Sequence, residues 1–160
     1  MARDLTTEEV ASRFAQADAF VAEAGTALYR AQRLLGDADF HGAIEAAQHS
    51  IEFAVKAVLI FTGIPFEKAH DVSKQLEKAS AQIRGLEQYQ KEMLARLKWI
   101  SPMWSWANVS AVYGSLDVPA SRLFKSDDAR IAIEYAREAN STAQIMLSAV
   151  RNGQAKLLEP

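Results

Sequence analysis

The chain has 160 residues, 49% of them hydrophobic, and a formal net charge of −2 at pH 7. This length can bury one sizeable core, so we predict a single domain over residues 1–160 without a linker. The longest apolar run, residues 57–61, is far shorter than the about 20 residues that a membrane helix needs. Because the start MARDLTTEEV is polar and unlike a secretory signal, we expect a cytoplasmic protein without membrane contact. The absence of cysteine excludes disulfides and thiolate chemistry, and the small net charge gives no general attraction to nucleic acid.

Two long helices are predicted in the first half of the chain. The first carries an apolar stripe at steps of three and four residues, with Thr6 and Glu9 as a capping box at its start and Gly36-Asp37 as its stop. This stripe consists of Val10, Phe14, Ala17, Val21, Ala24, Leu28, Ala31 and Leu35. The second helix spans about 39–62 and ends at Gly63-Ile64-Pro65, because glycine allows a left-handed cap and proline cannot continue the helix.

Three further helices are predicted in the second half. The third has apolar positions from Val72 to Ile83 and ends at Gly85. The fourth begins near Leu86, and Pro102 either kinks it or starts a new segment. The last begins at an N-cap formed by Ser126. Residues 114–125 are expected to form a loop. Since the connections are short, the pattern predicts an all-α, five-helix antiparallel up-and-down bundle. Its long stripes leave room for a helix of a second subunit.

A polar strip interrupts the otherwise apolar second helix. At about 100° per residue its members project to one side, and they are Glu45, Gln48, His49, Glu52 and Lys56. One interpretation is a solvated face in which Glu52 and Lys56 form a pair worth ~0.2–0.5 kcal/mol. The other is a partly shielded strip that binds a polar ligand or a partner. The sequence leaves both open.

The tryptophans and the basic residues of the second half offer other sites. Trp99, Trp104 and Trp106 surround Pro102 and either stack on bases, at about 1–3 kcal/mol each, or fill a core or dimer interface. The basic residues line a phosphate-binding face or are simply solvated, and they are Arg84, Lys91, Arg96, Lys98, Arg122, Lys125, Arg130 and Arg137. Because the Glu-x-x-His spacing of di-iron bundles occurs only once, at residues 67–70, we expect no metal and no cofactor.

Residues 39–76, DFHGAIEAAQHSIEFAVKAVLIFTGIPFEKAHDVSKQL, resemble the signature of the HEPN family (higher eukaryotes and prokaryotes nucleotide-binding domain). The matching positions are Glu52, Lys56, Gly63, His70, Asp71 and Val72. The resemblance implies a small helical bundle that dimerises and that pairs, in many members, with a nucleotidyltransferase partner. The pair His70-Asp71 either caps the third helix or closes one end of a groove lined by Glu52 and Lys56.

Active members of this family are metal-independent ribonucleases. They use an Arg followed after about four to six residues by a His, since imidazole can move the 2′-hydroxyl proton while guanidinium stabilises the phosphate charge. No arginine here has a histidine at that spacing, and the corresponding region, WSWANVSAVYGSL, offers Asn108 and Tyr113 instead.

The resemblance therefore implies a non-catalytic module that binds nucleotide, RNA or a nucleotidyltransferase. The alternative is a divergent ribonuclease, or the toxin component of a toxin–antitoxin pair, that uses His49, His70 and Lys56.

Overall fold

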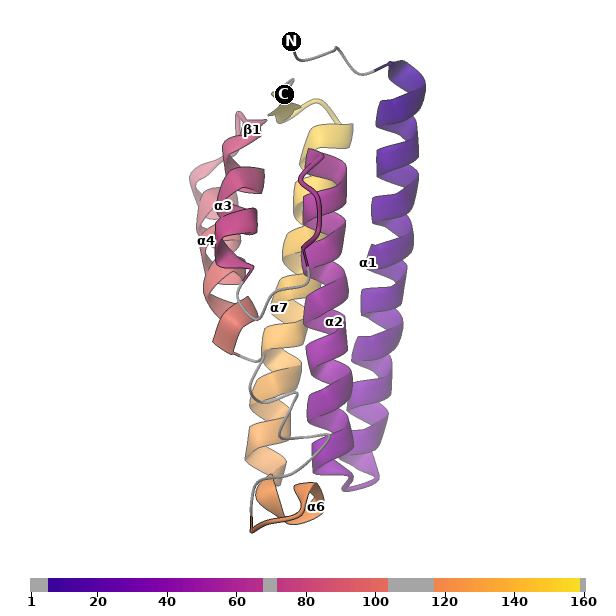
Figure 1. The fold of residues 1–160 in the computed structure, drawn as a ribbon, viewed down its shortest axis with the longest axis vertical. Helices are drawn as coiled ribbons and strands as arrows, with labels where there is room; N and C mark the ends of the chain where they lie inside the picture. The colour runs from indigo at the N-terminus through magenta and orange to yellow at the C-terminus, as the bar shows by residue number, and fades with distance from the viewer. Residues whose placement is uncertain (1–5, 68–71, 104–116, 159–160) are drawn as a thin grey trace.

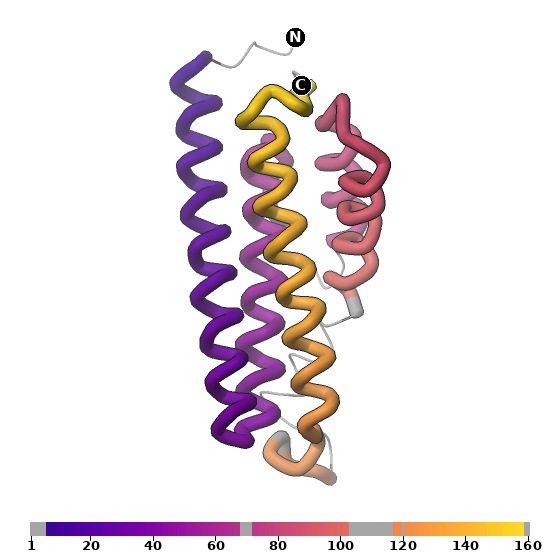
Figure 2. Tube along the Cα trace, turned by 180° about the vertical axis from the view of Figure 1, so that it is seen from behind, coloured from indigo at the N-terminus to yellow at the C-terminus, as the bar shows by residue number. Residues whose placement is uncertain are grey.

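Helices make up almost the whole fold. The computed structural model describes residues 6–67, 72–103 and 117–158. Its helices are α1 (Thr7–Gly36), α2 (Phe40–Thr62), α3 (Ser73–Ala81), α4 (Gln88–Met103), α6 (Ala120–Leu123) and α7 (Ser126–Arg151), and its strands are β1 (Ile83–Arg84) and β2 (Lys156–Leu157). In Figures 1 and 2, α1, α2 and α7 stand side by side, and the shorter α3 and α4 pack beside α2 and α7. The predicted all-α class is confirmed. None of the helices in these ranges is both long and apolar enough to span a membrane.

The helix count and the strand pair differ from the prediction. The described residues contain six helices, because the one-turn α6 lies in the stretch 114–125 that was expected to be a loop. They also contain an antiparallel pair of two-residue strands, in which Ile83 faces Leu157 and Arg84 faces Lys156. Strands this short show no alternation of apolar and polar residues, so periodicity cannot reveal them.

The helix directions also differ from a simple up-and-down bundle. In Figure 1, α1 runs downward and α2 runs upward, as a short connection requires. However, α7 also runs upward beside α2, so these two neighbouring helices are parallel. The apolar stripes predict which face of each helix is buried, but they do not indicate whether two neighbouring helices are parallel or antiparallel.

The predicted helix ends are largely confirmed. The Thr6 hydroxyl accepts from the Glu9 amide at 3.2 Å, and the Glu9 carboxylate accepts from the Thr6 amide at 2.8 Å. Gly63 ends α2 in the left-handed conformation, at φ 75°. The expected N-cap of α7 is wrong by one residue: Lys125 holds that position, and its amide donates to the Asp128 carboxylate at 2.8 Å.

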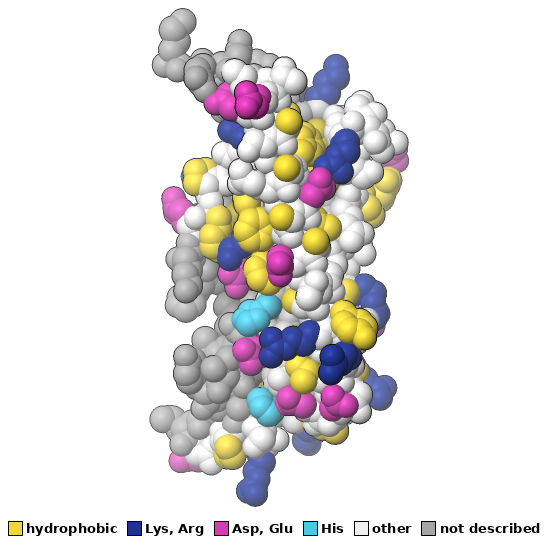
Figure 3. All heavy atoms as spheres, turned by 90° about the vertical axis from the view of Figure 1, so that its right-hand side faces the viewer, with side chains coloured by type: hydrophobic (Ala, Val, Ile, Leu, Met, Phe, Trp, Pro, Cys, Tyr) yellow, Lys and Arg dark blue, Asp and Glu magenta, His cyan; other side chains and the backbone are white. Residues whose placement is uncertain are grey.

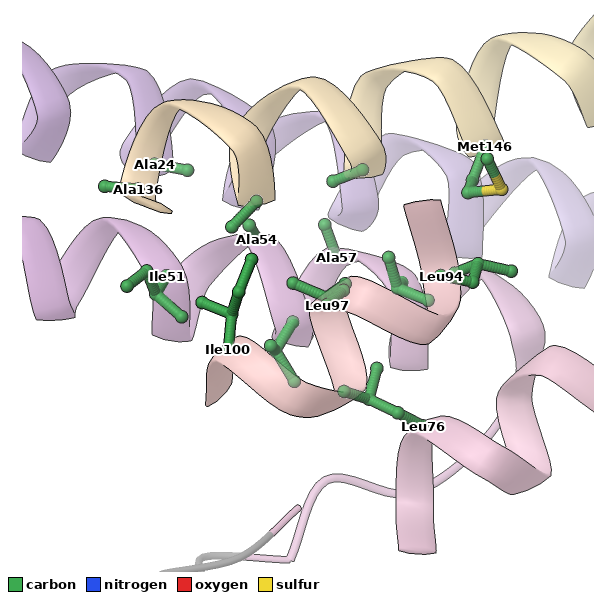
Figure 4. Packing of buried hydrophobic residues seen from close by; sticks show 14 of the residues in the cluster. Ala24, Ile51, Ala54, Ala57, Leu76, Leu94, Leu97, Ile100, Ala136 and Met146 are labelled. Carbon is green, nitrogen blue, oxygen red and sulfur yellow. The ribbon is translucent and has the colours of Figure 1, made fainter. Parts of the chain in front are cut away.

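Small residues bring the three long helices close together. From α1, the fully buried residues are Ala17, Ala24 and Ala31, and the larger members of its stripe are only half-buried. The Ser50 hydroxyl of α2 donates to the Ala24 carbonyl at 2.7 Å, which requires a close approach of the two backbones. Figure 4 shows alanines between these helices, whereas bulky Ile and Leu side chains fill the space between α2 and the α3–α4 pair. Alanine in α1 therefore sets the distance to α2, and bulky residues set the distance to α4.

Candidate functional site

The polar strip of α2 (Glu45, Gln48, His49, Glu52 and Lys56) lies at the edge of the core, as its narrow arc predicts. Most other positions of α2 are buried against α1, α4 and α7. In the strip itself, Gln48 is buried and the other four side chains are half-buried. None of the five is fully exposed, so this surface differs from an ordinary solvated helix face.

Lys56 is held by a carboxylate and three aromatic rings. Its Nζ lies 2.7 Å from Glu52 Oε1, which confirms the predicted pair. The same nitrogen lies 4.7 Å from the ring centroid of Phe66, 5.6 Å from that of Phe53 and 5.9 Å from that of Phe20. Only 21% of the Lys56 side chain is exposed. Because ring faces and a carboxylate already surround this cation, Lys56 is engaged within its own fold.

The side chains in the N-terminal part of the strip, unlike Lys56, have no partners among the described residues. Within the described residues, no hydrogen bond or ion pair engages the side chains of Glu45 or His49. Gln48 is 8% exposed, and its Oε1 is buried without a hydrogen-bond partner among the same residues. A buried amide oxygen without a partner costs about 1–3 kcal/mol and calls for an explanation. We refer to Glu45, Gln48 and His49 as the open end of the strip, and to Glu52 and Lys56 as its paired end.

The two ends also differ in their surroundings on the molecular surface. Figure 3 views the molecule from the side of α1, where hydrophobic side chains gather mostly in the upper half. In the lower half, histidines lie among Lys, Arg, Asp and Glu side chains. His41, one turn before Glu45 on α2, pairs with the Asp39 carboxylate at 3.0 Å. The open end therefore lies in a polar neighbourhood, whereas the paired end lies among phenylalanines.

A comparison with known protein families identifies one whose sequence pattern matches this chain. The HEPN domain model matches residues 17–145. The chain belongs to the HEPN domain family. Among solved structures, the crystal structure of TT1696 from Thermus thermophilus is similar, with a TM-score of 0.62 and 19% sequence identity over 82% of this chain and 98% of that chain. At this identity the likeness concerns the fold alone. None of the curated proteins matches the chain.

The signature positions of this HEPN domain that the structure describes have clear packing roles. Glu52 and Lys56 pair with each other, Gly63 forms the left-handed end of α2, and buried Val72 occupies the N-cap position of α3. His70 and Asp71 lie outside the described residues, as do Trp104, Trp106, Asn108 and Tyr113. The roles predicted for those six residues stay predictions.

Trp99 lies on a mixed surface formed by α4 and α7. Its side chain is 54% exposed, its ring is 5.8 Å from that of Tyr135, and the Arg96 guanidinium lies 6.0 Å from it. Nearby on α7, Ile131 is 51% exposed, which adds apolar area to this face. A surface of this composition is typical of protein interfaces, where aromatic residues and arginine are enriched.

The predicted phosphate-binding face is partly neutralised by acidic neighbours. The helices α4 and α7 are in contact, as that prediction required. Arg96 forms a two-pronged ion pair with Glu138, and this hydrogen-bonded carboxylate raises the pKa of the guanidinium above its usual value. Arg137 pairs with Glu134 on the same helix. Within the described residues, no three His, Asp or Glu side chains lie close enough together to hold a metal ion.

The aromatic residues around Lys56 were not predicted from the sequence. Phe53 precedes Lys56 by three residues on the same helix, which was a usable signal. Phe20 and Phe66 come from α1 and from the segment after α2, so only the tertiary structure brings them to the lysine.

Proposed function

We propose that this HEPN domain is a non-catalytic binding module whose contact surface is the open end of the α2 strip. One observation carries the proposal: Gln48 Oε1 is buried without a partner in the described residues, beside the unpaired side chains of Glu45 and His49. Such groups are costly for a fold to keep unless something binds them. At the paired end Glu52 and Lys56 bond each other, whereas among the described residues the side chains of the open end have no partner.

The chemistry of the open end favours a ligand that donates hydrogen bonds. The carboxylate of Glu45 accepts and the imidazole of His49 can accept or donate, whereas the covered amide oxygen of Gln48 can accept from a ligand only after the groups around it move. Glu45 and Glu52 carry two negative charges against the one positive charge of Lys56, so the side chains of the strip themselves give phosphate no net attraction. We therefore propose that the strip binds the amino-bearing edge of a nucleobase, in a nucleotide or in single-stranded RNA. The phosphates of this ligand are directed away from the strip.

Two facts support binding without catalysis. No arginine in the chain has a histidine at the spacing that the family ribonucleases use. The divergent ribonuclease alternative needs Lys56 to stabilise a phosphate, but its ammonium group is already occupied by Glu52 and three phenyl rings. A nucleotidyltransferase partner fits the same acidic strip through a basic or donor side chain, and a ligand titration separates the two kinds of ligand.

A thermal-shift titration with AMP, ATP, GTP and a short single-stranded RNA tests the proposal. A ligand at about 100 times its dissociation constant should stabilise the protein by ~2.7 kcal/mol, which raises the unfolding midpoint by roughly 5–10 °C for a domain of this size. His49→Ala should abolish the shift, whereas His41→Ala, on the same helix but paired with Asp39, should leave it unchanged.

Three outcomes would contradict parts of this proposal. A shift that persists in His49→Ala places the ligand elsewhere. The absence of a shift with any nucleotide or RNA leaves a protein partner as the ligand of the strip. RNA cleavage that disappears in His49→Ala would show an enzyme and end the non-catalytic assignment.

We further propose that the module is a homodimer joined through the α4–α7 surface around Trp99. Trp99→Ala should shift the protein toward monomer in analytical ultracentrifugation at low micromolar concentration, because exposed aromatic residues dominate interface energies. Tyr29→Ala is the matched control, since Tyr29 is 64% exposed but lies on α1. An unchanged sedimentation coefficient for Trp99→Ala would rule out this surface as the interface.

A further inference from the structure

A separate groove lies at the end of the bundle where α1 begins and α7 ends. It is walled by the first turns of α1, the last turn of α7 and the segment that contains β2. Its volume is ≈ 730 Å³, which falls within the about 300–1,000 Å³ of pockets that take small molecules. No residue of the α2 strip lines it. The groove therefore offers a second site, independent of the proposed function.

The walls of the groove are mainly aliphatic. Val10 of α1, Val150 of α7 and Leu157 of β2 are half-buried and line it. Phe14 is the aromatic residue among its lining, and that ring already stacks on Phe61 at 6.2 Å and lies 5.4 Å from the Arg151 guanidinium. The free apolar surface is consequently better suited to an alkyl chain than to a nucleobase that needs an open ring face.

Positive charges at the groove exceed negative ones. Its charged lining residues are Arg13, Asp18, Arg151 and Lys156. Arg151 is neutralised by Asp18, since Arg151 Nη2 lies 2.8 Å from Asp18 Oδ2. Arg13 and Lys156 have no carboxylate partner within the described residues. Two cations from different elements, Arg13 on α1 and Lys156 on β2, thus line the groove without a carboxylate, and the Arg13 guanidinium lies against Gly63 at the end of α2.

We propose that this groove binds a small anion with an aliphatic body, of the chemical class of a medium-chain alkyl carboxylate. The alkyl chain lies against Val10, Val150 and Leu157, where its apolar surface is removed from water. The anionic group lies at the mouth between Arg13 and Lys156. Both parts are required, because the cations select the anion and the aliphatic walls select the chain length.

Calorimetric titration of the full chain with octanoate, octan-1-ol and acetate tests the two requirements. Octanoate should bind at least tenfold more tightly than octan-1-ol, which lacks the charge, and than acetate, which lacks the chain. Lys156→Gln should weaken octanoate binding several-fold, because it removes an exposed cation of the mouth and leaves the walls in place.

A blocking variant and its control locate the site. Ala11 is exposed and lines the groove, so Ala11→Trp should fill it and abolish octanoate binding. Ala22→Trp should bind normally, since Ala22 is exposed on the same face of α1 about 16 Å further along the helix. Methyl NMR shifts of Val10 and Leu157 on octanoate addition give a readout that needs no variant. Equal octanoate binding by the wild type and Ala11→Trp, no shift of these methyl groups, or tighter binding of AMP than of octanoate in the groove would each overturn the proposal.

Discussion

The two ends of the α2 strip contain similar residues but have different neighbours. At the paired end, the carboxylate of Glu52 and three phenylalanines surround the Lys56 ammonium group. At the open end, one helical turn away, a buried amide oxygen and two half-buried polar side chains have no partner within the described residues. A signature residue can thus serve the fold while its neighbour on the same helix face remains free to bind.

Lys56→Ala should give the largest change, because it removes the centre of the paired end. It eliminates cation–π contacts worth about 0.5–1 kcal/mol when exposed and more when shielded, together with an ion pair worth ~0.2–1 kcal/mol. We expect a loss of about 1–2 kcal/mol in the free energy of unfolding, measured by urea denaturation. Lys74→Ala, at an exposed position of α3, should change it by less than about 0.5 kcal/mol. A neutral Lys56→Ala that nevertheless loses nucleotide binding would reverse the assignment of the two ends.

Gln48→Leu should have a smaller effect of opposite sign. Replacing a buried, unsatisfied amide by an apolar side chain of similar size removes its desolvation cost and should stabilise the fold by about 1 kcal/mol. Gln75→Leu is the matched control, because the buried Gln75 amide bonds the backbone of Glu67 at 3.0 Å through Oε1 and at 2.9 Å through Nε2. That control should be destabilised. Destabilisation of Gln48→Leu as well would show that Gln48 has a partner within the chain.

Glu52→Gln should give the smallest change, since it keeps a hydrogen-bond acceptor for Lys56 and removes only the charge. We expect the free energy of unfolding to fall by ~0.2–0.5 kcal/mol, the usual value for such a helical pair. The Glu52 side chain is 38% exposed, so added salt should shrink the difference from the wild type. Urea denaturation of the variant and the wild type at low and high ionic strength measures this difference. A salt-independent loss well above this range would mean that Glu52 does more than pair with Lys56.

The helices and their ends could be predicted from the sequence because local interactions specify them. The capping box of Thr6 and Glu9, the glycine stop at Gly63 and the Glu52–Lys56 pair all involve residues within four positions of each other or a single backbone preference. The two-residue strands and α6 were missed, since elements of one turn or less carry no period to detect.

The sequence by itself determined the helical class, the long helices α1, α2 and α7 and the polar strip, because periodicity of apolar residues reports directly which face of a helix is buried. Only the tertiary structure decided what each polar residue meets there. Phe20 and Phe66 reach Lys56 from other segments, Arg13 and Lys156 line a common groove from different elements, and Gln48 is buried without a partner in the described residues. The physical reason is that the energy of a polar group depends on its partners and its burial, and both come from residues distant in the chain.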